Sequence, residues 1–261
     1  MGEKADNPFD GRPVWADLPT PDLEAAQWFY GELFGWQAEP GGPEVSGRIV
    51  FTLGGRSVAT AGPTHSDRTP RLWRVYIGTN DVTTAVERIR ANGGQVLRGP
   101  MNAMDGGRVA VCSDSSGAVF GLWQPRSGRQ PKRRTGPGVL AWHELATSAP
   151  KEAERFYGEV FNWELTPNPR APEVHFGWRL EGEQIAGLTP VTETDIWPLQ
   201  SSPHWLVSFS TSDCEAVAAR ALELGGQVPI APTELGPYRF AVLTDSQYIA
   251  FGIIEIPPNT N

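Results

Sequence analysis

The stretch Phe29-Tyr-Gly-Glu-Leu-Phe-Gly-Trp36 occurs a second time in the chain, as Phe156-Tyr-Gly-Glu-Val-Phe-Asn-Trp163. The two copies are 127 residues apart, and the short segments that precede them, Trp15-Ala-Asp-Leu18 and Trp142-His-Glu-Leu145, have the same spacing. A strand-like segment, a helical segment and a turn that repeat at one spacing indicate an internal duplication.

Each half is predicted to contain two units of strand, helix and three strands. In the first unit, residues 12–18 alternate as a strand, and Thr20 with Pro21 predicts a helix start that Gly35 brings to an end. The pattern restarts at Leu72, with Asp81 as the next helix start. The sequence therefore predicts two such units in residues 12–124.

The second half follows the same order. Ser148 is expected to cap a helix over 150–160, and Gly225-Gly-Gln-Val228 matches Gly93-Gly-Gln-Val96 after the even-numbered helices. A chain of 261 residues is long enough for two domains. We expect a first domain at 8–125, a Pro-rich and basic linker at 126–137, and a second domain at 138–258.

Composition narrows the possible partners and the compartment. A formal net charge of -8 argues against nucleic acid as the main partner, because neutralising phosphates requires a basic face. No stretch approaches the 18 or so apolar residues that a membrane span needs. The two cysteines, Cys112 and Cys214, fall in different halves and form no disulfide framework. We expect a cytoplasmic protein with no membrane or nucleic-acid partner, present as a monomer or homodimer.

Four βαβββ units paired in two domains resemble the vicinal oxygen chelate superfamily, which includes glyoxalase I, extradiol dioxygenases and bleomycin-resistance proteins. The resemblance rests on the Phe-Tyr-Gly-Glu-x-Phe-x-Trp helix ends, the Gly-Gly-Gln-Val segments and Asp114-Ser-Ser-Gly-Ala-Val-Phe120, which corresponds to Asp245-Ser-Gln-Tyr-Ile-Ala-Phe251. Within the superfamily, the chain is similar to two-domain, glyoxalase-like proteins of actinobacteria that are often labelled hydroxylases. The resemblance implies an α+β fold in which each domain is an open, cup-shaped mixed sheet with helices outside.

Metal-dependent members of this superfamily hold their ion with His, Gln or Glu on the first strand of each unit and Glu on the last. Aligned to that pattern, the first-strand positions in this chain are Trp15, Arg74, Trp142 and Leu206, and the last-strand positions of the even units are Gly121 and Gly252. None of these side chains binds a divalent metal. We therefore expect no metal and no cofactor.

One alternative stays open for the second half. A one-residue slip would bring His143 to the ligand position, with His204 and Glu255 as possible partners in a triad like that of the extradiol dioxygenases. Such a slip also turns a side chain to the opposite face of a sheet. The other interpretation is that the two histidines are polar residues at strand ends.

Strand alternation predicts which side chains line the cups. If Val75, Ile77, Val207 and Phe209 face the helices, their neighbours face the cups. Cup one then contains Trp15, Asp17, Arg74, Tyr76 and Trp123. Cup two contains Trp142, Glu144 and Ser208, with Trp178 or Arg179 depending on the phase of that strand.

An aromatic wall with a few convergent polar groups is typical of a small-molecule site. We predict a protein that binds a small aromatic molecule, with cup one favoured. The alternative is an enzyme of secondary metabolism or detoxification, of lyase, hydroxylase or dioxygenase type, in which Asp17 or Glu144 acts as a general base without metal or a metal ion participates. A purely structural interpretation is that Trp15 and Trp142 fill the cups and that Asp17 pairs with Arg74.

Overall fold

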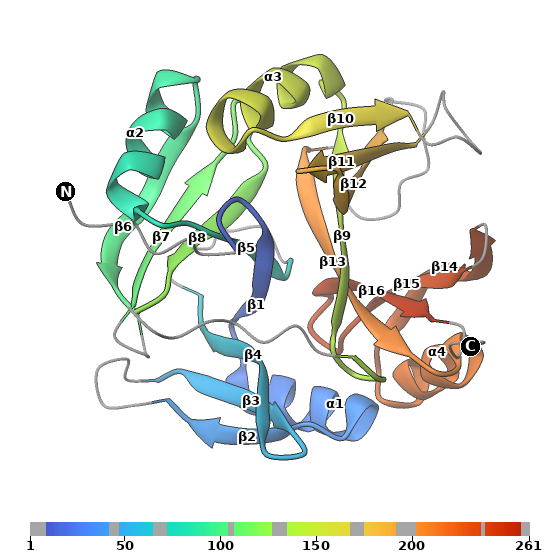
Figure 1. The fold of residues 1–261 in the computed structure, drawn as a ribbon. Coiled ribbons are helices and arrows are strands. Elements are labelled where there is room, and N and C mark those ends of the chain that lie inside the picture. Colours follow the sequence, from blue (N-terminus) through green and yellow to red (C-terminus); the bar gives the residue numbers. More distant parts are fainter. Residues whose placement is uncertain are drawn as a thin grey trace.

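The structure is a computed structural model that describes residues 9–41, 47–64, 72–103, 107–126, 135–167, 175–191, 202–235 and 238–256. It contains two eight-stranded mixed sheets (Figure 1), each built from the strands of one half of the chain. The linker predicted at 126–137 includes 127–134, which lie outside the described residues. The proposed domain boundaries therefore remain a prediction.

Sheet A has the strand order β2-β3-β4-β1-β5-β8-β7-β6. Its strands, in chain order, are β1 (Pro13–Thr20), β2 (Gln37–Pro40), β3 (Ile49–Leu53), β4 (Arg56–Pro63), β5 (Arg74–Gly78), β6 (Gln95–Asn102), β7 (Arg108–Ser113) and β8 (Val119–Gln124). β1 is parallel to β4 and antiparallel to β5, and β5 is parallel to β8.

Sheet B repeats this topology in the order β10-β11-β12-β9-β13-β16-β15-β14. Its strands are β9 (Leu140–Thr147), β10 (Glu164–Pro167), β11 (Phe176–Leu180), β12 (Glu183–Pro190), β13 (His204–Thr211), β14 (Gln227–Leu235), β15 (Tyr238–Thr244) and β16 (Ala250–Glu255). β9 is antiparallel to β13, as β1 is to β5 in sheet A. The predicted α+β architecture of two open mixed sheets is confirmed.

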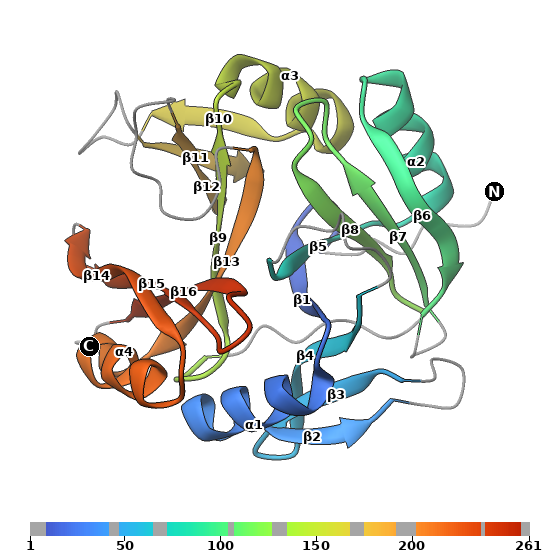
Figure 2. The same cartoon turned by 180° about the vertical axis from the view of Figure 1, so that it is seen from behind.

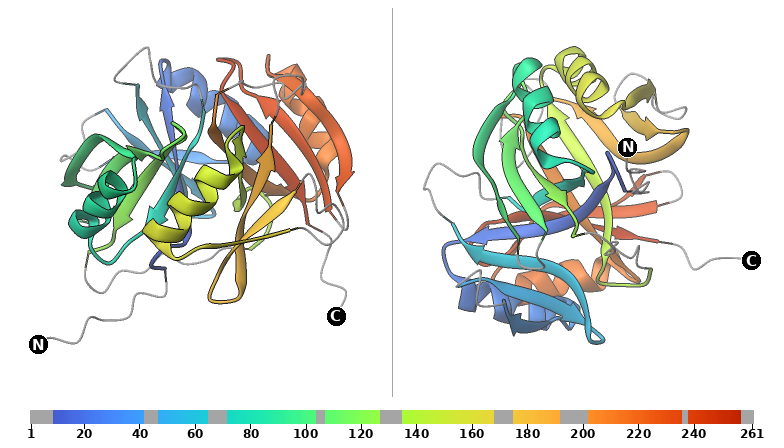
Figure 3. Two further views of the ribbon diagram at one scale, coloured as in Figure 1. Left: turned by 90° about the horizontal axis from the view of Figure 1, so that it is seen from above. Right: turned by 60° about the vertical axis from the view of Figure 1, so that its left-hand side comes forward.

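The described residues form four helices, one per unit, outside the sheets: α1 (Leu23–Phe34), α2 (Val82–Ala91), α3 (Pro150–Phe161) and α4 (Cys214–Glu223). α1 packs beside α4 and α2 beside α3, so each pair joins the two halves at opposite ends of the molecule (Figures 2 and 3). Within the described residues no helix is long and apolar enough to cross a membrane.

Two predicted helix starts are wrong. Thr20 belongs to β1, and Asp22 caps α1 by accepting a hydrogen bond from the Ala25 N–H group. Ser148 does not cap α3, because the N-cap is Ala149, whose side chain cannot accept a hydrogen bond. The structure shows that Pro150 at the first turn marks this start without a capping side chain.

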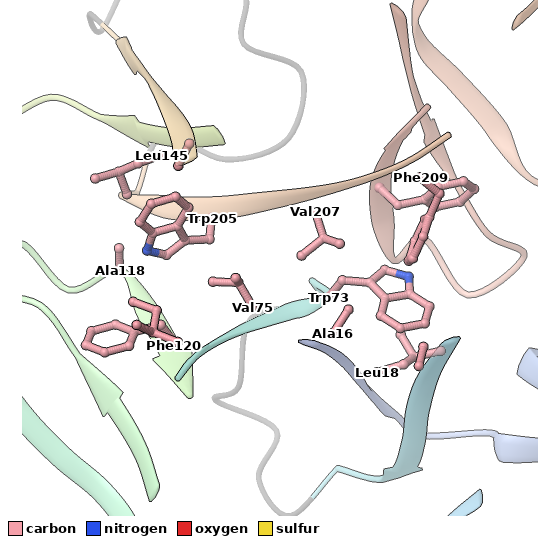
Figure 4. Close-up of a cluster of buried hydrophobic side chains, with 14 of the residues drawn as sticks. Ala16, Leu18, Trp73, Val75, Ala118, Phe120, Leu145, Trp205, Val207 and Phe209 are labelled. Atoms are coloured by element: carbon pink, nitrogen blue, oxygen red, sulfur yellow. The ribbon is translucent and has the colours of Figure 1, made fainter. Parts of the chain in front are cut away.

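The hydrophobic core runs between the two sheets. Val75 on β5 and Val207 on β13 lie close together in the middle of this core, with Trp73 and Trp205 further along (Figure 4). The prediction that Val75, Ile77, Val207 and Phe209 are buried is confirmed. What the sequence did not indicate is that this face of each sheet packs against the other half as well as against helices.

The repeated octapeptides join the halves. The Tyr30 hydroxyl donates a hydrogen bond to Asp245 Oδ2 at 3.1 Å and accepts one from Trp73 Nε1 at 2.9 Å. Tyr157 repeats this arrangement with Asp114 at 3.1 Å and Trp205 at 2.8 Å. Since each tyrosine and its aspartate come from different halves, the motifs form a matched pair of buried contacts across the interface.

Each of these aspartates also organises the turn that carries it. Asp114 Oδ1 accepts hydrogen bonds from the backbone N–H groups of Ser116, Gly117 and Ala118. Burial raises the pKa of Asp114, whereas the hydrogen bonds from Ser116, Ala118 and Tyr157 lower it. The Asp-Ser-Ser-Gly motif is thus a structural element of the interface between the halves.

Candidate functional site

The face of each sheet that points away from the shared core carries the predicted site residues. On β1, Ala16 and Leu18 are fully buried in the core, so Trp15 and Asp17 project to the opposite face. Asp17 is paired in register with Thr60 on β4 and Arg74 on β5, and Trp15 is paired with Tyr76. We use "cup one" for this face of sheet A and "cup two" for the corresponding face of sheet B.

Asp17 is the centre of cup one. Its side chain is 2% exposed, and its Oδ1 atom accepts hydrogen bonds from the Arg48 guanidinium and from Thr60 Oγ1, the latter at 2.8 Å. Arg74 Nη1 lies 3.5 Å from Asp17 Oδ2. The carboxylate is therefore held by two cations and one hydroxyl, and the predicted Asp17–Arg74 pair is present as its longer contact.

Positive charge is concentrated beside Asp17. Burial lowers the pKa of Arg48, Tyr76 raises it, and the positive charges of Arg74 and Arg98 lower it further. A carboxylate is tolerated in a buried position only when it is paired, and here it has more than one partner.

Two glycines of cup one lie directly beneath the side chains of Tyr76 and Arg48. A Cβ atom added at Gly121 would come within 2.4 Å of the Tyr76 ring, and one at Gly62 within 2.8 Å of the Arg48 side chain. Trp15 is half-buried, and its Nε1 donates to Thr60 Oγ1 at 3.2 Å. The two glycines therefore leave the space in which Tyr76 and Arg48 lie.

Glu144 is the centre of cup two. Its Oε2 atom accepts a hydrogen bond from Trp142 Nε1 at 2.9 Å, and its Oε1 atom accepts one from Thr189 Oγ1 at 2.8 Å. Thr189 in turn contacts His175 Nδ1 at 3.2 Å. Among the described residues no Lys or Arg forms an ion pair with Glu144.

The pKa of Glu144 is raised by burial, and no ion-pair partner among the described residues offsets this. The side chain keeps some exposed surface but is surrounded by protein atoms, and burial raises its pKa to about 7, whereas the hydrogen bonds from Trp142 and Thr189 lower it. The pKa of His175 is lowered by burial, which disfavours a positive charge on this neighbour. Glu144 can therefore exchange a proton near neutral pH.

Glycines line cup two as well. A Cβ atom at Gly187 would lie 1.9 Å from Glu144 Oε2, and one at Gly252 would lie 2.1 Å from Ser208 Oγ. Ser208 is buried and paired in register with Trp142, as Tyr76 is with Trp15. The two cups thus share one backbone plan.

Of the other predicted residues, some face a cup and one lies in the core. Trp123 lies half-buried on the cup-one face of β8, two residues beyond the Tyr76–Gly121 pair. Trp178 does not face cup two, because it is buried in the core beside Tyr157 and Trp163. Arg179, the next residue of β11, donates a hydrogen bond from Nη2 to the Gly182 carbonyl oxygen in the turn between β11 and β12.

Four contributors were missed by reasoning from the sequence: Arg48, Thr60, His175 and Thr189. Arg48 and His175 each directly precede a strand, β3 and β11, and they are 127 residues apart, like the repeated motifs. That spacing was the available signal. It could not show that side chains preceding a strand turn back over the cup.

The donor set on these faces does not fit a divalent metal. Tyr76 and Ser208 lie over the two glycines where the superfamily pattern has Glu, so a carboxylate there would collide with them. Within the described ranges, no three His, Cys, Asp or Glu side chains come together as a metal-binding group. Arg48 and Arg74 beside Asp17 would also repel a cation.

The proposed triad of His143, His204 and Glu255 is not brought together. His143 is 5% exposed on the core face of β9, opposite Val207, and its Nδ1 atom has no hydrogen-bond partner among the described residues. Burial lowers its pKa to about 3, so it is neutral at physiological pH. Glu255 instead accepts a hydrogen bond from the Cys214 backbone N–H at 3.0 Å.

A small cleft lies between the halves and reaches Arg74, whose Nη1 atom is 3.5 Å from Asp17 Oδ2. Its lining residues are mostly apolar and comprise Leu72, Trp73, Arg74, Val119, Pro203, His204 and Trp205. His204 is buried there, and its Nδ1 atom is 2.8 Å from the Ser202 carbonyl oxygen. Of the residues predicted for a site, the cleft contains Arg74 and His204.

Comparison with known proteins gives consistent results. Residues 12–122 match the family model described as Glyoxalase/Bleomycin resistance protein/Dioxygenase superfamily. The anthracycline biosynthesis protein DauV of Streptomyces sp. (strain C5) is 32% identical over 262 residues, which cover 94% of this chain and 94% of that protein.

Two solved structures share the fold at low sequence identity. The dioxygenase LapB of Pseudomonas sp. KL28 superposes with a TM-score of 0.64 at 14% identity, covering 96% of this chain and 94% of the other. The Mn(II)-bound glyoxalase of Novosphingobium aromaticivorans gives 0.62 at 14% identity, covering 94% and 81%.

Proposed function

Because the chain belongs to the Glyoxalase/Bleomycin resistance protein/Dioxygenase superfamily, we propose that it binds a small planar aromatic molecule on its cup faces, with no metal between protein and ligand. The observation that carries this proposal is the repeated Trp-x-acid pair. In each cup a half-buried tryptophan lies two residues from a carboxylate, with its indole N–H held by a hydrogen bond. A fixed aromatic wall beside a few polar groups suits a flat ligand.

The similarity to DauV supports the ligand class. DauV is named as an anthracycline biosynthesis protein, and anthracyclines contain fused flat rings that carry phenol and quinone oxygens. Such rings offer both a face for stacking on Trp15 or Trp142 and oxygens for hydrogen bonding to the polar groups of the cups. A polycyclic phenol or quinone is therefore the ligand class to test first.

The binding test uses a hydroxyanthraquinone as the probe, titrated against the full chain by calorimetry and by the absorbance of the probe. We expect binding that EDTA does not change. Replacing both Trp15 and Trp142 by Ala should weaken binding in each cup about fivefold, since each cup then loses one ring contact that contributes on the order of 1 kcal/mol. Trp28→Ala is the matched control, because Trp28 is 55% exposed on helix α1.

The proposal fails if the probe does not bind, or if it binds equally well to the double variant. Binding that is abolished by EDTA and restored by a divalent ion would contradict the part of the proposal that concerns metal.

A second candidate function is proton transfer by Glu144. Three features favour it: a pKa of about 7, no paired cation among the described residues, and two hydrogen bonds that orient the carboxyl group. A carboxylate of this kind can take a proton from an acidic C–H or O–H group of a bound ring system and return it. Asp17, held by Arg48 and Arg74, is less suited to that role.

The test for this candidate is hydrogen–deuterium exchange at an acidic C–H of a bound anthrone-type ring, followed by NMR. The exchange rate should rise with pH around an apparent pKa near 7, because the carboxylate form is the base. Glu144→Gln should remove the catalysed exchange, whereas Glu154→Gln, at an exposed position of α3, should leave it unchanged. Catalysed exchange that persists in Glu144→Gln excludes Glu144 as the base.

A further inference from the structure

Cup one has more positive than negative charge around its central carboxylate. Arg48 and Arg74 both contact Asp17, and their side chains are only 24% and 13% exposed. Two guanidinium groups and one carboxylate leave a net charge of +1 in a partly dehydrated position. In such a position an unbalanced charge attracts an opposite charge more strongly than it would on the open surface.

Arg74 is the less satisfied of the two cations. Its contact with Asp17 is long, at 3.5 Å through Nη1, and its Nε atom is buried without a hydrogen-bond partner among the described residues. Asp17 is already held by Arg48 and Thr60 through its other oxygen. The buried Nε–H group of Arg74 therefore lacks an acceptor among the described residues, and a guanidinium edge that includes Nε matches the two oxygens of a carboxylate.

The corresponding place in cup two lacks this arrangement. The register pairs Glu144 with Leu206 where Asp17 is paired with Arg74, and His175 directly precedes β11 as Arg48 precedes β3. Since both cups share one backbone plan, the two arginines are a local feature of cup one that the fold itself does not require.

We propose that cup one is an anion-binding subsite, in which Arg74 receives a carboxylate or phenolate oxygen of a planar ligand beside Trp15 while Asp17 keeps Arg48 in place. The ligand oxygen supplies the missing acceptor for the Arg74 Nε–H group and brings the charge of the cluster to zero. This inference rests on the proposed function and narrows its ligand class to aromatic anions.

Three probes separate charge from ring shape: naphthoate, which is flat and anionic; naphthamide, which is flat and neutral; and the saturated decalin carboxylate, which is anionic without an aromatic face. Each is titrated by calorimetry into the full chain at two salt concentrations. We expect naphthoate to bind tighter than naphthamide by at least about tenfold, with an advantage that shrinks as salt is raised.

Arg74→Leu is the central variant, because leucine is the residue at the matching position of cup two and leaves Asp17 with Arg48. It should weaken naphthoate at least about tenfold and naphthamide less than about threefold. Arg74→Lys keeps the charge without the paired donors and should give an intermediate affinity. Arg88→Leu removes an arginine from the exposed surface of α2 and should change nothing. The melting temperature of each variant checks that it is folded.

The outcomes distinguish the two proposals. If naphthoate and naphthamide bind equally, or if Arg74→Leu weakens both alike, the anion subsite is wrong while aromatic binding stands. If the decalin carboxylate binds as well as naphthoate and is lost in Arg74→Leu, the anion subsite stands and the aromatic preference is wrong. If the chain binds none of the three probes, both proposals are overturned.

Discussion

Asp17 in cup one lies between Arg48 and Arg74, whereas Glu144, at the same position of cup two, is hydrogen-bonded to Trp142 and Thr189. Both acids follow a tryptophan by two residues, and both stand on the strand that joins the two units of their sheet. The difference lies in their neighbours, and it makes Asp17 part of a cationic cluster and Glu144 a carboxyl group with a pKa of about 7.

The strand register shows which residues differ between matching positions of the two cups. The matched residues, cup one first, are Arg74 and Leu206, Tyr76 and Ser208, Thr60 and Gly187, Gly62 and Thr189, and Arg48 and His175. Two arginines are thus replaced by an aliphatic residue and a histidine whose pKa is lowered by burial. The comparison teaches that a duplicated acid takes its chemical character from the neighbouring strands.

The largest expected effect is on stability, and it separates the two acids. Asp17→Asn should destabilise the fold by about 3 kcal/mol, because Arg48 and Arg74 lose their counter-charge in a partly buried position. Glu144→Gln should cost less than about 1 kcal/mol, since the amide can accept from Trp142 and donate to Thr189. Urea unfolding at pH 7 measures both, and equal losses would contradict the assignment of different environments.

The next effect concerns His143, whose counterpart in the first half is Ala16. The pKa of His143 is about 3 in the folded state and about 6.5 when unfolded, so the unfolded chain binds the extra proton and stability falls as pH decreases below about 6.5. His143→Ala should therefore be less costly at pH 4.5 than at pH 7.5, by about 2 kcal/mol. A cost that is the same at both pH values would show that His143 is not buried in its neutral form.

The two interface tyrosines, Tyr30 and Tyr157, are expected to contribute equally to the free energy of unfolding. Tyr30→Phe and Tyr157→Phe each remove one hydrogen bond to an aspartate and leave one buried tryptophan N–H without its acceptor. Each should cost about 2 kcal/mol, and the two costs should agree within about 0.5 kcal/mol. A clear difference between the variants in urea unfolding would mean that the halves do not share the interface equally.

The smallest effect is the pH dependence from Glu144. Its folded pKa of about 7 exceeds the unfolded value, so the folded state binds the extra proton and stability falls as pH rises from about 4.5 to 7. Because the side chain keeps some solvent access, we expect a loss of about 1 kcal/mol over that range. Glu144→Gln should flatten this part of the curve, whereas Glu154→Gln should not. A wild-type curve that Glu144→Gln leaves unchanged would place the pKa of Glu144 near its usual value.

Much of the fold could be predicted from the sequence, because the evidence for it is local and occurs twice. Alternating strands, a helix end at Gly35 and a spacing of 127 residues indicated the four units and their order. Alternation also placed Trp15 with Asp17 and Trp142 with Glu144 on one face of each sheet. It left the choice between Trp178 and Arg179 open, because a strand of five residues does not show its phase, and the structure places Trp178 in the core.

The sequence by itself determined the duplication, the strand faces and the tryptophan–acid pairs, since all of these depend on neighbours along the chain. Only the tertiary structure decided that Arg48 reaches Asp17 and that Thr189 reaches Glu144, because these contacts cross strands and depend on register and on side chains that turn over a glycine. It also decided that Tyr30 and Tyr157 join the halves, a contact between residues 215 and 43 positions apart. Hydrogen bonds and ion pairs act over a few ångströms in space, and a linear pattern does not show which distant residues the fold brings that close.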